Sequence, residues 1–540
     1  MEKRLLLAIV ISFLIIFLYQ RFFLKPPEPE KLKESKLIEK IKEKKQPEIQ
    51  KIKTEKETGE FIEKNVVEEK NIKEIKVETS LFSATFLNKG GVLKSLKMKK
   101  YKDEKGSNLE LISQKNNDNL LPLSLKTGSS EIDKILNTSL YSPSEENITL
   151  KNGQRKDLIF YFSDGKSISG KKKYSFTGGI YTMDIENEIY INNEKKNYSI
   201  ILTPRIGNPP EEDLKSHREY IVFLNLNNLK RIDTKKLKDG KLYDGYLTWA
   251  AYDSTYFTEI AIVNEQSSIS IITPNSNKSN EKYLKIFKPN SIYFGPKDYD
   301  LLRSMGNQME KVIDFGFFGI IAKILLKALK SIHSFIPNYG FSIILLTLIL
   351  KVILFPLTWS SSISMAKMQK IQPKMKAIRE KYRKYKTDPE QRKKMNEEIM
   401  KLYKSEGINP AGGCLPLILQ IPILWGFFNL LSKSIEMRHQ PFIFWIKDLS
   451  KKDPYFVTPI LMGATQFILQ KMTPTGGDPA QRKLMMFMPV FMTIFFLNFQ
   501  SGLVLYWLTQ NILQIGQQYL INKFIYKKEH GEKRIQRKKS

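Results

Sequence analysis

Apolar and polar residues are distributed in two different ways along this chain of 540 residues. Up to about residue 310 the sequence is polar and rich in lysine, whereas from about residue 315 to 525 apolar runs alternate with short charged connections. A chain of this length is expected to contain more than one domain. The pattern therefore predicts a water-exposed part followed by a part built for a membrane.

The first apolar run lies at the N-terminus. Leu5–Leu18 consists almost entirely of Leu, Ile, Phe and Val, and none of the small residues of a signal-peptide cleavage site follow it. We therefore predict an uncleaved signal-anchor helix over residues 1–24. Residues 25–75 are dense in Lys and Glu, and they hold too little apolar surface to order themselves, so a charged linker is expected there.

Residues 76–305 alternate between apolar and polar positions with a period of two, and Gly and Asn interrupt the alternation. The clearest segments are Lys76–Phe86, Val92–Met98, Ile180–Ile191, Tyr198–Thr203 and Ser268–Thr273. This pattern, rich in Tyr, Ile, Phe and Thr, predicts an antiparallel β-sandwich. The segment contains no catalytic motif, so a scaffold is favoured over a domain that binds sugar or peptide.

Helical spacing replaces the alternation after about residue 296. Within residues 306–336, Lys323, Lys327 and Lys330 lie opposite an apolar stripe made of Ile321, Ile324, Leu325, Ala328 and Ile332. The stripe predicts an amphipathic helix in the membrane interface. A soluble docking helix would have the same pattern, but the adjacent span favours the membrane.

Five further apolar runs occupy residues 337–523: Tyr339–Thr358, Leu415–Leu431, Phe456–Leu469, Leu484–Phe499 and Ser501–Ile521. Together with the N-terminal anchor they predict six spans. The expected fold class is a polytopic α-helical membrane protein with a five-helix core and a cytoplasmic helical hairpin, joined to an all-β sandwich domain.

Charge decides the expected orientation. The chain carries a net charge of +31, with 87 Lys and Arg against 56 Asp and Glu, and much of this excess lies in two places. The connection 359–414 holds 14 basic against 6 acidic residues, and the segment 523–540 holds 8 against 2. Because basic loops stay in the cytoplasm, we place both there, with the N-terminus and the C-terminus inside and residues 25–338 in the periplasm.

Several classes of function are excluded by what the sequence lacks. Four scattered histidines and the single Cys414 offer no metal site, disulfide framework or thiol chemistry, so no cofactor is expected. The five core runs contain no Asp or Glu, and the chain shows no internal repeat, which argues against an ion-coupled transporter. No protease motif is present either. We therefore expect a protein that is not an enzyme.

Lys351 is a positive charge well inside the first core run. Placing an ionisable group at that depth costs roughly 3 kcal/mol, and such groups usually face protein or water. Snorkelling toward the nearby helix end is the competing interpretation. Thr347 lies one turn earlier on the same face. Because the five runs hold no carboxylate, Lys351 is predicted to be an unpaired cation that needs water or a transient anionic partner.

A second set of polar residues lies on other core runs: Gln420, Tyr506, Gln510 and Gln514. The last three recur at four-residue spacing and therefore share one helix face. Hydrogen bonding that only holds a helix bundle together would explain most of these positions.

The connection at residues 361–406 is predicted to form a helical hairpin. One stripe consists of Met375, Ile378, Tyr382 and Tyr385, and its partner consists of Met395, Ile399 and Leu402. Asp388 and Pro389 supply an N-cap and a first-turn proline between them. The outer face is free for an acidic or RNA-bearing partner and carries Lys376, Arg379, Lys381, Arg383, Lys384, Arg392 and Lys393.

Long stretches of the sequence resemble the YidC membrane protein insertases of the YidC/Oxa/Alb family. The resemblance rests on NYGFSIILLTLILKVILFPLT, SMAKMQKIQPKMKAIREKY, GINPAGGCLPLILQIPI and PFIFWIKDLSKKDPYFVTPILMG in the core, with FQSGLVLYW near its end. TSLFSATFLNKGGVLKSLKMKKY and YFGPKDYDLL resemble the periplasmic domain of the Gram-negative type. Nearly the whole chain is covered except the linker.

The resemblance implies a hydrophilic groove in which a positive charge, usually arginine, attracts acidic parts of an incoming segment. Lys351 occupies that position, which keeps the charge but loses arginine's planar fork. Thr347 matches a groove threonine, and Trp507 follows Tyr506 where many relatives have a second tyrosine. The implied partners are nascent membrane proteins, the Sec translocon, the signal recognition particle receptor and the ribosome. The basic tail at 524–540 is equally suited to anionic lipids. A membrane-anchored periplasmic chaperone or scaffold is the alternative function.

Overall fold

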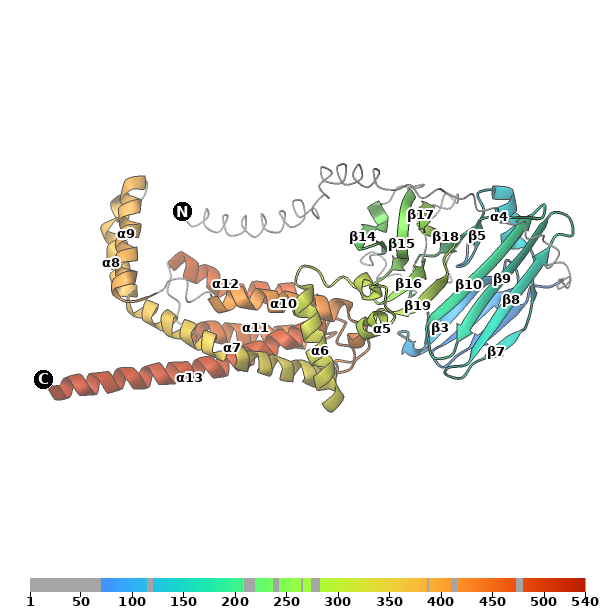
Figure 1. Ribbon diagram of the computed structural model, residues 1–540. Coiled ribbons are helices and arrows are strands. Elements are labelled where there is room, and N and C mark those ends of the chain that lie inside the picture. Colours follow the sequence, from blue (N-terminus) through green and yellow to red (C-terminus); the bar gives the residue numbers. More distant parts are fainter. Residues whose placement is uncertain are drawn as a thin grey trace, which may run out of the picture. The chain divides into compact units, whose positions relative to one another are not determined.

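The computed structural model describes most of the chain from residue 69 onward (Figure 1). The described ranges are 69–113, 120–204, 206–207, 219–236, 242–263, 266–272, 282–385, 388–408, 415–472 and 479–539. The predicted signal-anchor helix and nearly all of the predicted linker lie outside these ranges.

Two sheets form the β domain. The smaller one has the order β4, β3, β2, β1, β7, with β1 (Glu74–Glu78), β2 (Phe82–Leu87), β3 (Val92–Lys102), β4 (Asn108–Glu110) and β7 (Asn147–Thr149). Its strands pair antiparallel except that β1 and β7 run parallel. One helix, α4 (Ser130–Thr138), belongs to this part of the chain.

Within the described ranges, the larger sheet has 14 strands. Its main path runs through β5 (Leu125–Lys126), β12 (Ser199–Leu202), β18 (Tyr283–Phe287), β17 (Gln266–Ile272), β15 (Leu242–Asp253), β16 (Phe257–Ile262), β19 (Ser291–Pro296), β10 (Thr182–Ile191), β9 (Ile168–Thr177), β8 (Arg155–Ser163) and β6 (Ser142–Pro143). Off this path lie β11 (Glu194–Lys195), β13 (Tyr220–Asn225) and β14 (Asn228–Asp233), with the turn η1 (Thr234–Lys236) after β14.

Alternation along the strands builds the core between the sheets. Every second residue of β2 is buried, so Phe86 reaches rings of the larger sheet, with its centroid 5.2 Å from that of Tyr174 and 5.9 Å from that of Phe176. Aromatic pairs at such distances add packing energy beyond the area they bury. The predicted sandwich is therefore confirmed.

One predicted strand was wrong. The segment Lys76–Phe86 is not continuous, because the chain turns between β1 and β2. The Thr79 hydroxyl accepts hydrogen bonds from the backbone N–H groups of Leu81 and Phe82, both at 3.1 Å. This local side-chain bonding competes with strand pairing, which the alternation pattern alone does not register.

A short connecting segment follows the β domain and leads into helix. It contains α5 (Tyr299–Ser304), whose N-cap Asp298 accepts from two backbone N–H groups, and the 3-10 turn η2 (Met309–Val312). Helix α6 (Gly319–Phe335) then packs against α10 (Leu415–Lys433). A Cβ at Gly426 of α10 would lie 2.9 Å from the side chain of Ile321, so only glycine permits this close approach.

The faces of α6 differ from the prediction. Its inward face consists of Ala322, Leu325, Leu326 and Leu329, which are buried in the protein. Ile324, which was predicted to share the stripe of Leu325, is instead 63% exposed. The apolar residues Ile320 and Phe335 are exposed even further, at 78% and 84%. The helix therefore has a protein-facing side and separate exposed apolar residues, a division that a single stripe does not predict.

Helices occupy all five predicted core runs. They are α7 (Tyr339–Lys370), α10, α11 (Val457–Met472), α12 (Pro479–Phe496) and α13 (Ser501–Lys539). Only residues 497–500 separate α12 from α13, which confirms the predicted tight connection. Among the described residues, α7 is long and apolar enough to cross a membrane, and α12 contains a shorter apolar stretch, Met486–Phe496. The count of six spans stays a prediction.

The predicted hairpin consists of α8 (Gln372–Lys381), the turn η3 (Arg383–Tyr385) and α9 (Pro389–Ser405). The Asp388 carboxylate caps α9 by accepting from the N–H groups of Glu390 and Gln391 at 2.9 and 3.4 Å, which confirms the cap. Its small core is formed by Met368, Ile371, Met375 and Ile408, with Ile399, Leu402 and Tyr403 against them. Three predicted seam residues are in this core, whereas the Tyr382 hydroxyl instead donates to Glu398 at 2.9 Å.

Candidate functional site

Helix α7 turns Lys351 toward the protein interior. The helix begins at Asn338, whose side chain accepts from the N–H of Phe341, and runs without a break past Pro356. Lys351 is 7% exposed, while the next two residues, Val352 and Ile353, are 65% and 66% exposed. One face of α7 is therefore covered by protein, and the lysine lies on that face.

The partner of Lys351 comes from α13. Its ammonium donates a hydrogen bond to the side-chain oxygen of Gln514. Three residues later on the same helix, Gln517 donates to the hydroxyl of Thr358 at 2.5 Å. Two polar contacts therefore join α7 and α13, although only the first involves predicted site residues.

The environment of Lys351 leaves its charge without an ionic partner. Within the described part of the chain, no carboxylate forms an ion pair with it, and a neutral amide is its hydrogen-bond acceptor. A buried ammonium is stabilised far better by an anion than by an amide dipole. The arrangement can therefore attract a carboxylate that enters from elsewhere.

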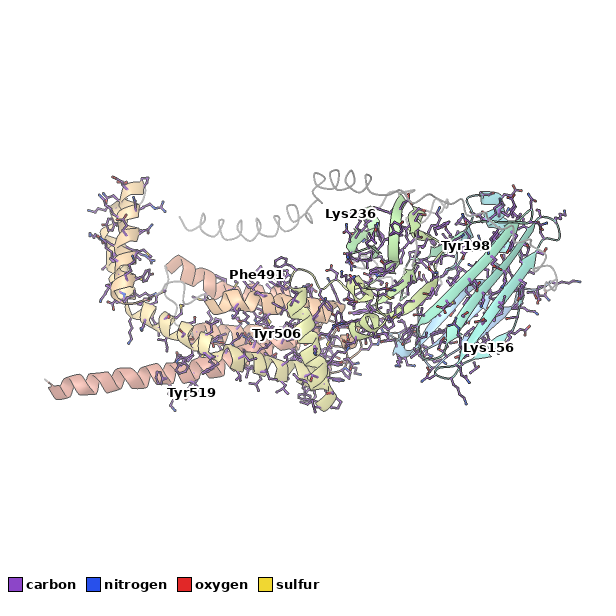
Figure 2. All side chains as sticks on the ribbon, in the orientation of Figure 1. Lys156, Tyr198, Lys236, Phe491, Tyr506 and Tyr519 are labelled. Atoms are coloured by element: carbon purple, nitrogen blue, oxygen red, sulfur yellow. The ribbon has the colours of Figure 1, made fainter. Side chains whose placement is uncertain are left out.

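Tyr506 and Gln420 form a second contact, between α13 and α10. The Tyr506 side chain is 2% exposed, hydrogen-bonds with Gln420 and stacks on Phe427 with ring centroids 4.3 Å apart. Figure 2 labels Tyr506 among the core helices. Gln510 lies on the same helix and is half-buried. The structure thus places the predicted polar residues of α13 along the seams with α7 and α10.

Two predicted residues are placed differently. Thr347 is fully buried, and its hydroxyl donates to the carbonyl of Ile343 in its own helix at 2.6 Å. Trp507 packs on Phe496 with centroids 5.4 Å apart, and its buried indole N–H has no hydrogen-bond partner among the described residues. Neither side chain hydrogen-bonds to another predicted site residue in the described ranges.

The sequence pattern missed Gln517, which continues the polar face one turn beyond Gln514. The signal was present, because residues three apart on a helix share a face. A neighbouring polar residue, Asn511, instead donates to the carbonyl of Met462 at 3.1 Å and ties α13 to α11. Only the packing of the helices shows that Gln517 contacts α7 while Asn511 contacts α11.

The basic residues of the hairpin lie mostly in solvent. Lys381 forms an ion pair with Glu398 at 2.7 Å, and the side chain of Lys376 lies 3.9 Å from Glu380. Arg379 is partly buried, and the remaining predicted residues are exposed: Arg383, Lys384, Arg392 and Lys393. Since Lys381 is already paired, the surface available to an acidic partner is smaller than the sequence suggests.

Together these features define a helical membrane protein that carries a large β-sandwich domain. Among the described residues, no group of His, Cys, Asp and Glu could hold a metal ion. The family model described as 60Kd inner membrane protein matches residues 331–529, and that of the YidC periplasmic domain matches residues 74–328. The chain belongs to the YidC family of membrane protein insertases.

Individual relatives agree over almost the full length. The membrane protein insertase YidC of Geotalea uraniireducens is 37% identical, with 97% of this chain and 99% of the relative covered. That of Syntrophus aciditrophicus is 35% identical, with 97% and 100% covered. A crystal structure of an active YidC insertase, with its first transmembrane domain resolved, is 19% identical, covers 84% of this chain and 93% of that one, and has a TM-score of 0.36.

Family membership has two direct consequences. The family consists of inner membrane proteins with a periplasmic domain, so the β-sandwich is periplasmic. Its members are insertases, which are not enzymes, and the expectation of a non-enzymatic protein is confirmed.

Proposed function

We propose that this chain inserts nascent membrane proteins into the inner membrane through a hydrophilic groove in which Lys351 is the attracting charge. One observation carries the proposal: the Lys351 ammonium is buried on α7 and has a neutral amide, Gln514, as its hydrogen-bond acceptor. An acidic side chain of an incoming segment would offer it a stronger acceptor.

The mechanism needs only exchange of non-covalent partners. A carboxylate of the substrate displaces Gln514 from Lys351, while Thr347, Gln420, Tyr506, Trp507 and Gln510 line the same path. The positive charge draws acidic segments in general, because an ammonium lacks the planar fork with which arginine grips two oxygens. Wetted helices and short spans also thin the bilayer locally, which lowers the cost of moving a polar tail across.

Apolar surfaces then guide the new helix into lipid. On α10, Leu419, Ile421 and Trp425 are 41–46% exposed. On α12, Phe487, Val490 and Phe491 are 58–70% exposed. Phe491 is labelled in Figure 2. Such faces suit contact with acyl chains or with a hydrophobic segment leaving the protein.

The proposal includes a topology and partners. Six spans, including the N-terminal anchor over residues 1–24, put both termini in the cytoplasm. After the anchor, the chain is divided into a linker (residues 25–75), the β domain (76–305), an interfacial helix (306–336), the five-span core (337–523) and a basic tail (524–540). The core includes the hairpin at residues 361–406. The hairpin meets the signal recognition particle receptor and the ribosome, the Sec translocon joins for some substrates, and the tail binds ribosome or anionic lipid.

The test is a charge reversal at Lys351. Lys351→Glu is expected to abolish insertion of substrates with acidic tails, while Lys351→Arg retains it, since attraction needs the charge and not the fork. Lys447→Glu is the control, because Lys447 is an exposed lysine between α10 and α11 that lies outside the proposed groove and hairpin. Insertion is followed by protease protection of the translocated tail in membrane vesicles.

Two results would contradict the proposal. Normal insertion with Lys351→Glu would favour the alternative of a periplasmic chaperone or scaffold, whose activity does not depend on a charge in the core. An inactive Lys351→Arg variant of normal abundance would show that attraction by charge is the wrong account.

A further inference from the structure

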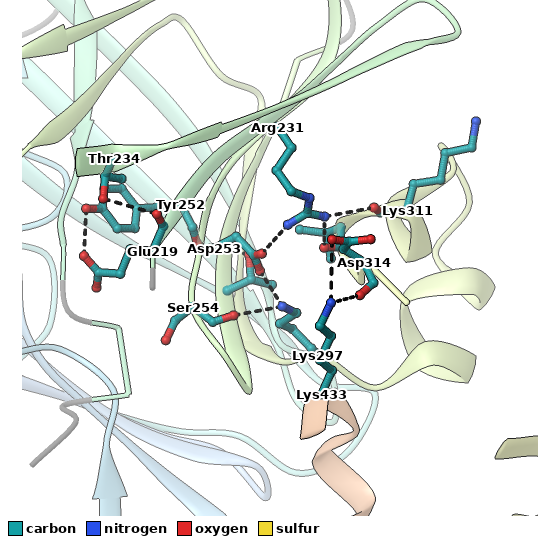
Figure 3. Close-up of polar contacts among 12 residues, drawn as sticks. Glu219, Arg231, Thr234, Tyr252, Asp253, Ser254, Lys297, Lys311, Asp314 and Lys433 are labelled. Carbon is teal, nitrogen blue, oxygen red and sulfur yellow. Dashed lines mark hydrogen bonds and ion pairs between the residues drawn. The ribbon is translucent and has the colours of Figure 1, made fainter. Parts of the chain in front are cut away.

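Charged side chains form a buried cluster at the end of the β domain from which the chain leaves toward α6 (Figure 3). At its centre Asp253, at the end of β15, is 1% exposed. Its carboxylate pairs with the guanidinium of Arg231 at 2.7 Å and with the ammonium of Lys297 at 2.9 Å. Lys297 is 5% exposed and also donates to the carbonyl of Ser254 at 2.8 Å.

Arg231 uses its second nitrogen to hold the connecting segment. That nitrogen donates to the carbonyls of Val312 and Lys311 in η2 (Figure 3). The indole N–H of Trp249 donates to the carbonyl of Asn307, just before η2, at 2.9 Å. The connecting segment is thus fastened to β14 and β15 by side chains buried in the β domain.

The same segment is fastened to a core helix two residues later. The carboxylate of Asp314 lies 3.6 Å from the ammonium of Lys433, the last residue of α10, which also donates to the Asp314 carbonyl. Burial alone would raise the pKa of Asp314, but Lys433 and Arg231 outweigh it and hold that pKa below its usual value. Asp314 is therefore charged at neutral pH.

A second lysine fastens neighbouring parts of the same region. Lys330 of α6 lies 2.6 Å from Asp300 of α5 and 2.8 Å from Glu436 of η4 (Ile435–Met437), which directly follows α10. A Cβ at Gly316 would lie 3.1 Å from the amide nitrogen of Asn429 in α10, so the connecting segment runs close against that helix.

The position of α10 matters because it supplies part of the proposed groove. Phe427 and Gln420, which contact Tyr506 of α13, lie on the same continuous helix as Lys433. The part of α10 from Phe427 to Lys433 contains no proline, so a constraint at Lys433 also constrains the stacking of Phe427 on Tyr506. The Arg231–Asp253–Lys297 cluster is buried, so removing one partner leaves a charge uncompensated. The Asp314–Lys433 pair is more exposed, with side chains 49% and 32% exposed.

We propose that the Arg231–Asp253–Lys297 cluster and the Asp314–Lys433 pair position α10 from the periplasmic domain and so set the contact of α10 with α13. These five are positioning residues, because the proposed groove does not include them. The inference rests on the proposed function in one respect only: that the seam between α10 and α13 takes part in insertion.

Distances are measured in the full-length protein with Cys414→Ser and spin labels at Lys166→Cys in the β domain and Leu419→Cys on α10, both exposed positions. Insertion is measured in the Cys414→Ser protein without these two labels, because Leu419 belongs to the exposed surface of α10 that is proposed to guide the new helix. Asp314→Asn and Lys433→Met are expected to broaden the distance distribution between the labels and to lower insertion several-fold. Lys433→Arg keeps both the charge and a donor for the Asp314 carbonyl, so it is expected to leave both quantities close to wild type. The matched control is Asp184→Asn, which removes the exposed Arg155–Asp184 pair of 2.8 Å.

Distances and insertion together decide the outcome. Unchanged distributions in Asp314→Asn and Lys433→Met would overturn the proposal. Broadened distributions with normal insertion would do the same, as would a Lys433→Arg variant that behaves like Lys433→Met. If Lys351→Glu proves harmless, the proposed groove fails, but the distance distributions still test whether these residues position α10.

Discussion

Lys351 and Lys172 are both buried without an ionic partner among the described residues, but their hydrogen-bond acceptors differ. Lys351 has a neutral amide as its acceptor. Lys172 of β9 is 1% exposed, and its ammonium donates to the carbonyls of Gly90 at 2.6 Å and Leu123 at 3.4 Å and lies over the ring of Tyr141. Burial lowers the pKa of Lys172 to about 7, so this group titrates in the physiological range.

Lys172 makes the stability of the β domain depend on pH. Its pKa in the folded state lies below its usual value, so between pH 7 and about 10.5 the unfolded state binds more protons, and stability rises with pH. From pH 7 to pH 9 the wild type should gain about 2 kcal/mol in unfolding free energy relative to Lys172→Met, since one pKa unit is worth about 1.4 kcal/mol. Thermal or denaturant unfolding of both proteins at the two pH values measures this difference.

A control at a neighbouring lysine isolates the effect of burial. Lys173 points outward and pairs with Asp157 at 3.3 Å, so Lys173→Met should leave the pH dependence of unfolding close to that of wild type. Equal pH dependence of wild type and Lys172→Met would contradict the depressed pKa.

Sequence reasoning finds one of these lysines and misses the other. Lys351 is conspicuous because it interrupts an apolar run. Lys172 is the middle of three consecutive lysines, a run that indicates a solvated surface. In β9, Lys171 and Lys173 face outward toward Glu188 and Asp157, and strand alternation turns Lys172 into the core. Whether the odd-numbered or the even-numbered residues of a strand are buried depends on which face of the sheet the second sheet covers.

At the scale of elements, local signals predict helix starts well and helix faces less well. The cap at Asp388 and the tight connection between α12 and α13 follow from short sequence motifs, and both are confirmed. The faces of α6 and the division of polar residues on α13 depend on which helices pack against them. A helical stripe shows that a face is apolar, but not whether protein or lipid covers it.

The hairpin helix α9 should depend on its N-cap. Asp388→Ala removes the acceptor for the N–H groups of Glu390 and Gln391, which is expected to cost about 1 kcal/mol of local stability. Amide hydrogen exchange in the first turn of α9 should then accelerate about fivefold. Glu397→Ala, at an exposed mid-helix position, is the control and should leave this exchange unchanged.

Unaltered exchange in Asp388→Ala would show that packing of Met375 against Ile399 and Leu402, and not the cap, sets the start of α9. In that case a core substitution such as Leu402→Ala should accelerate exchange instead.

At the scale of the whole molecule, the distribution of basic residues predicts a topology. The connection 359–414 and the segment 523–540 carry the largest basic excess, and the family has a periplasmic domain matching residues 74–328. Since short basic loops are retained inside, the hairpin and the β domain should lie on opposite sides of the membrane.

Cysteine labelling tests this topology directly. In a Cys414→Ser background, single cysteines replace the exposed Lys166 of the β domain or the exposed Lys394 of α9. A membrane-impermeant thiol reagent should label position 166 in intact spheroplasts and position 394 only after lysis. Labelling of position 394 before lysis would contradict the predicted orientation.

The sequence by itself determined which parts of this chain form strands and helices, the family to which it belongs, and the presence of an uncompensated charge at Lys351. These properties depend on local periodicity and on residue chemistry, so they can be inferred from the order of residues without knowledge of the contacts between distant segments. The tertiary structure decided which neighbours those residues meet: Gln514 beside Lys351, Gln517 beside Thr358, Lys172 between the sheets, and Asp253 between Arg231 and Lys297. These contacts join residues far apart in the chain, so they depend on packing that no local pattern encodes.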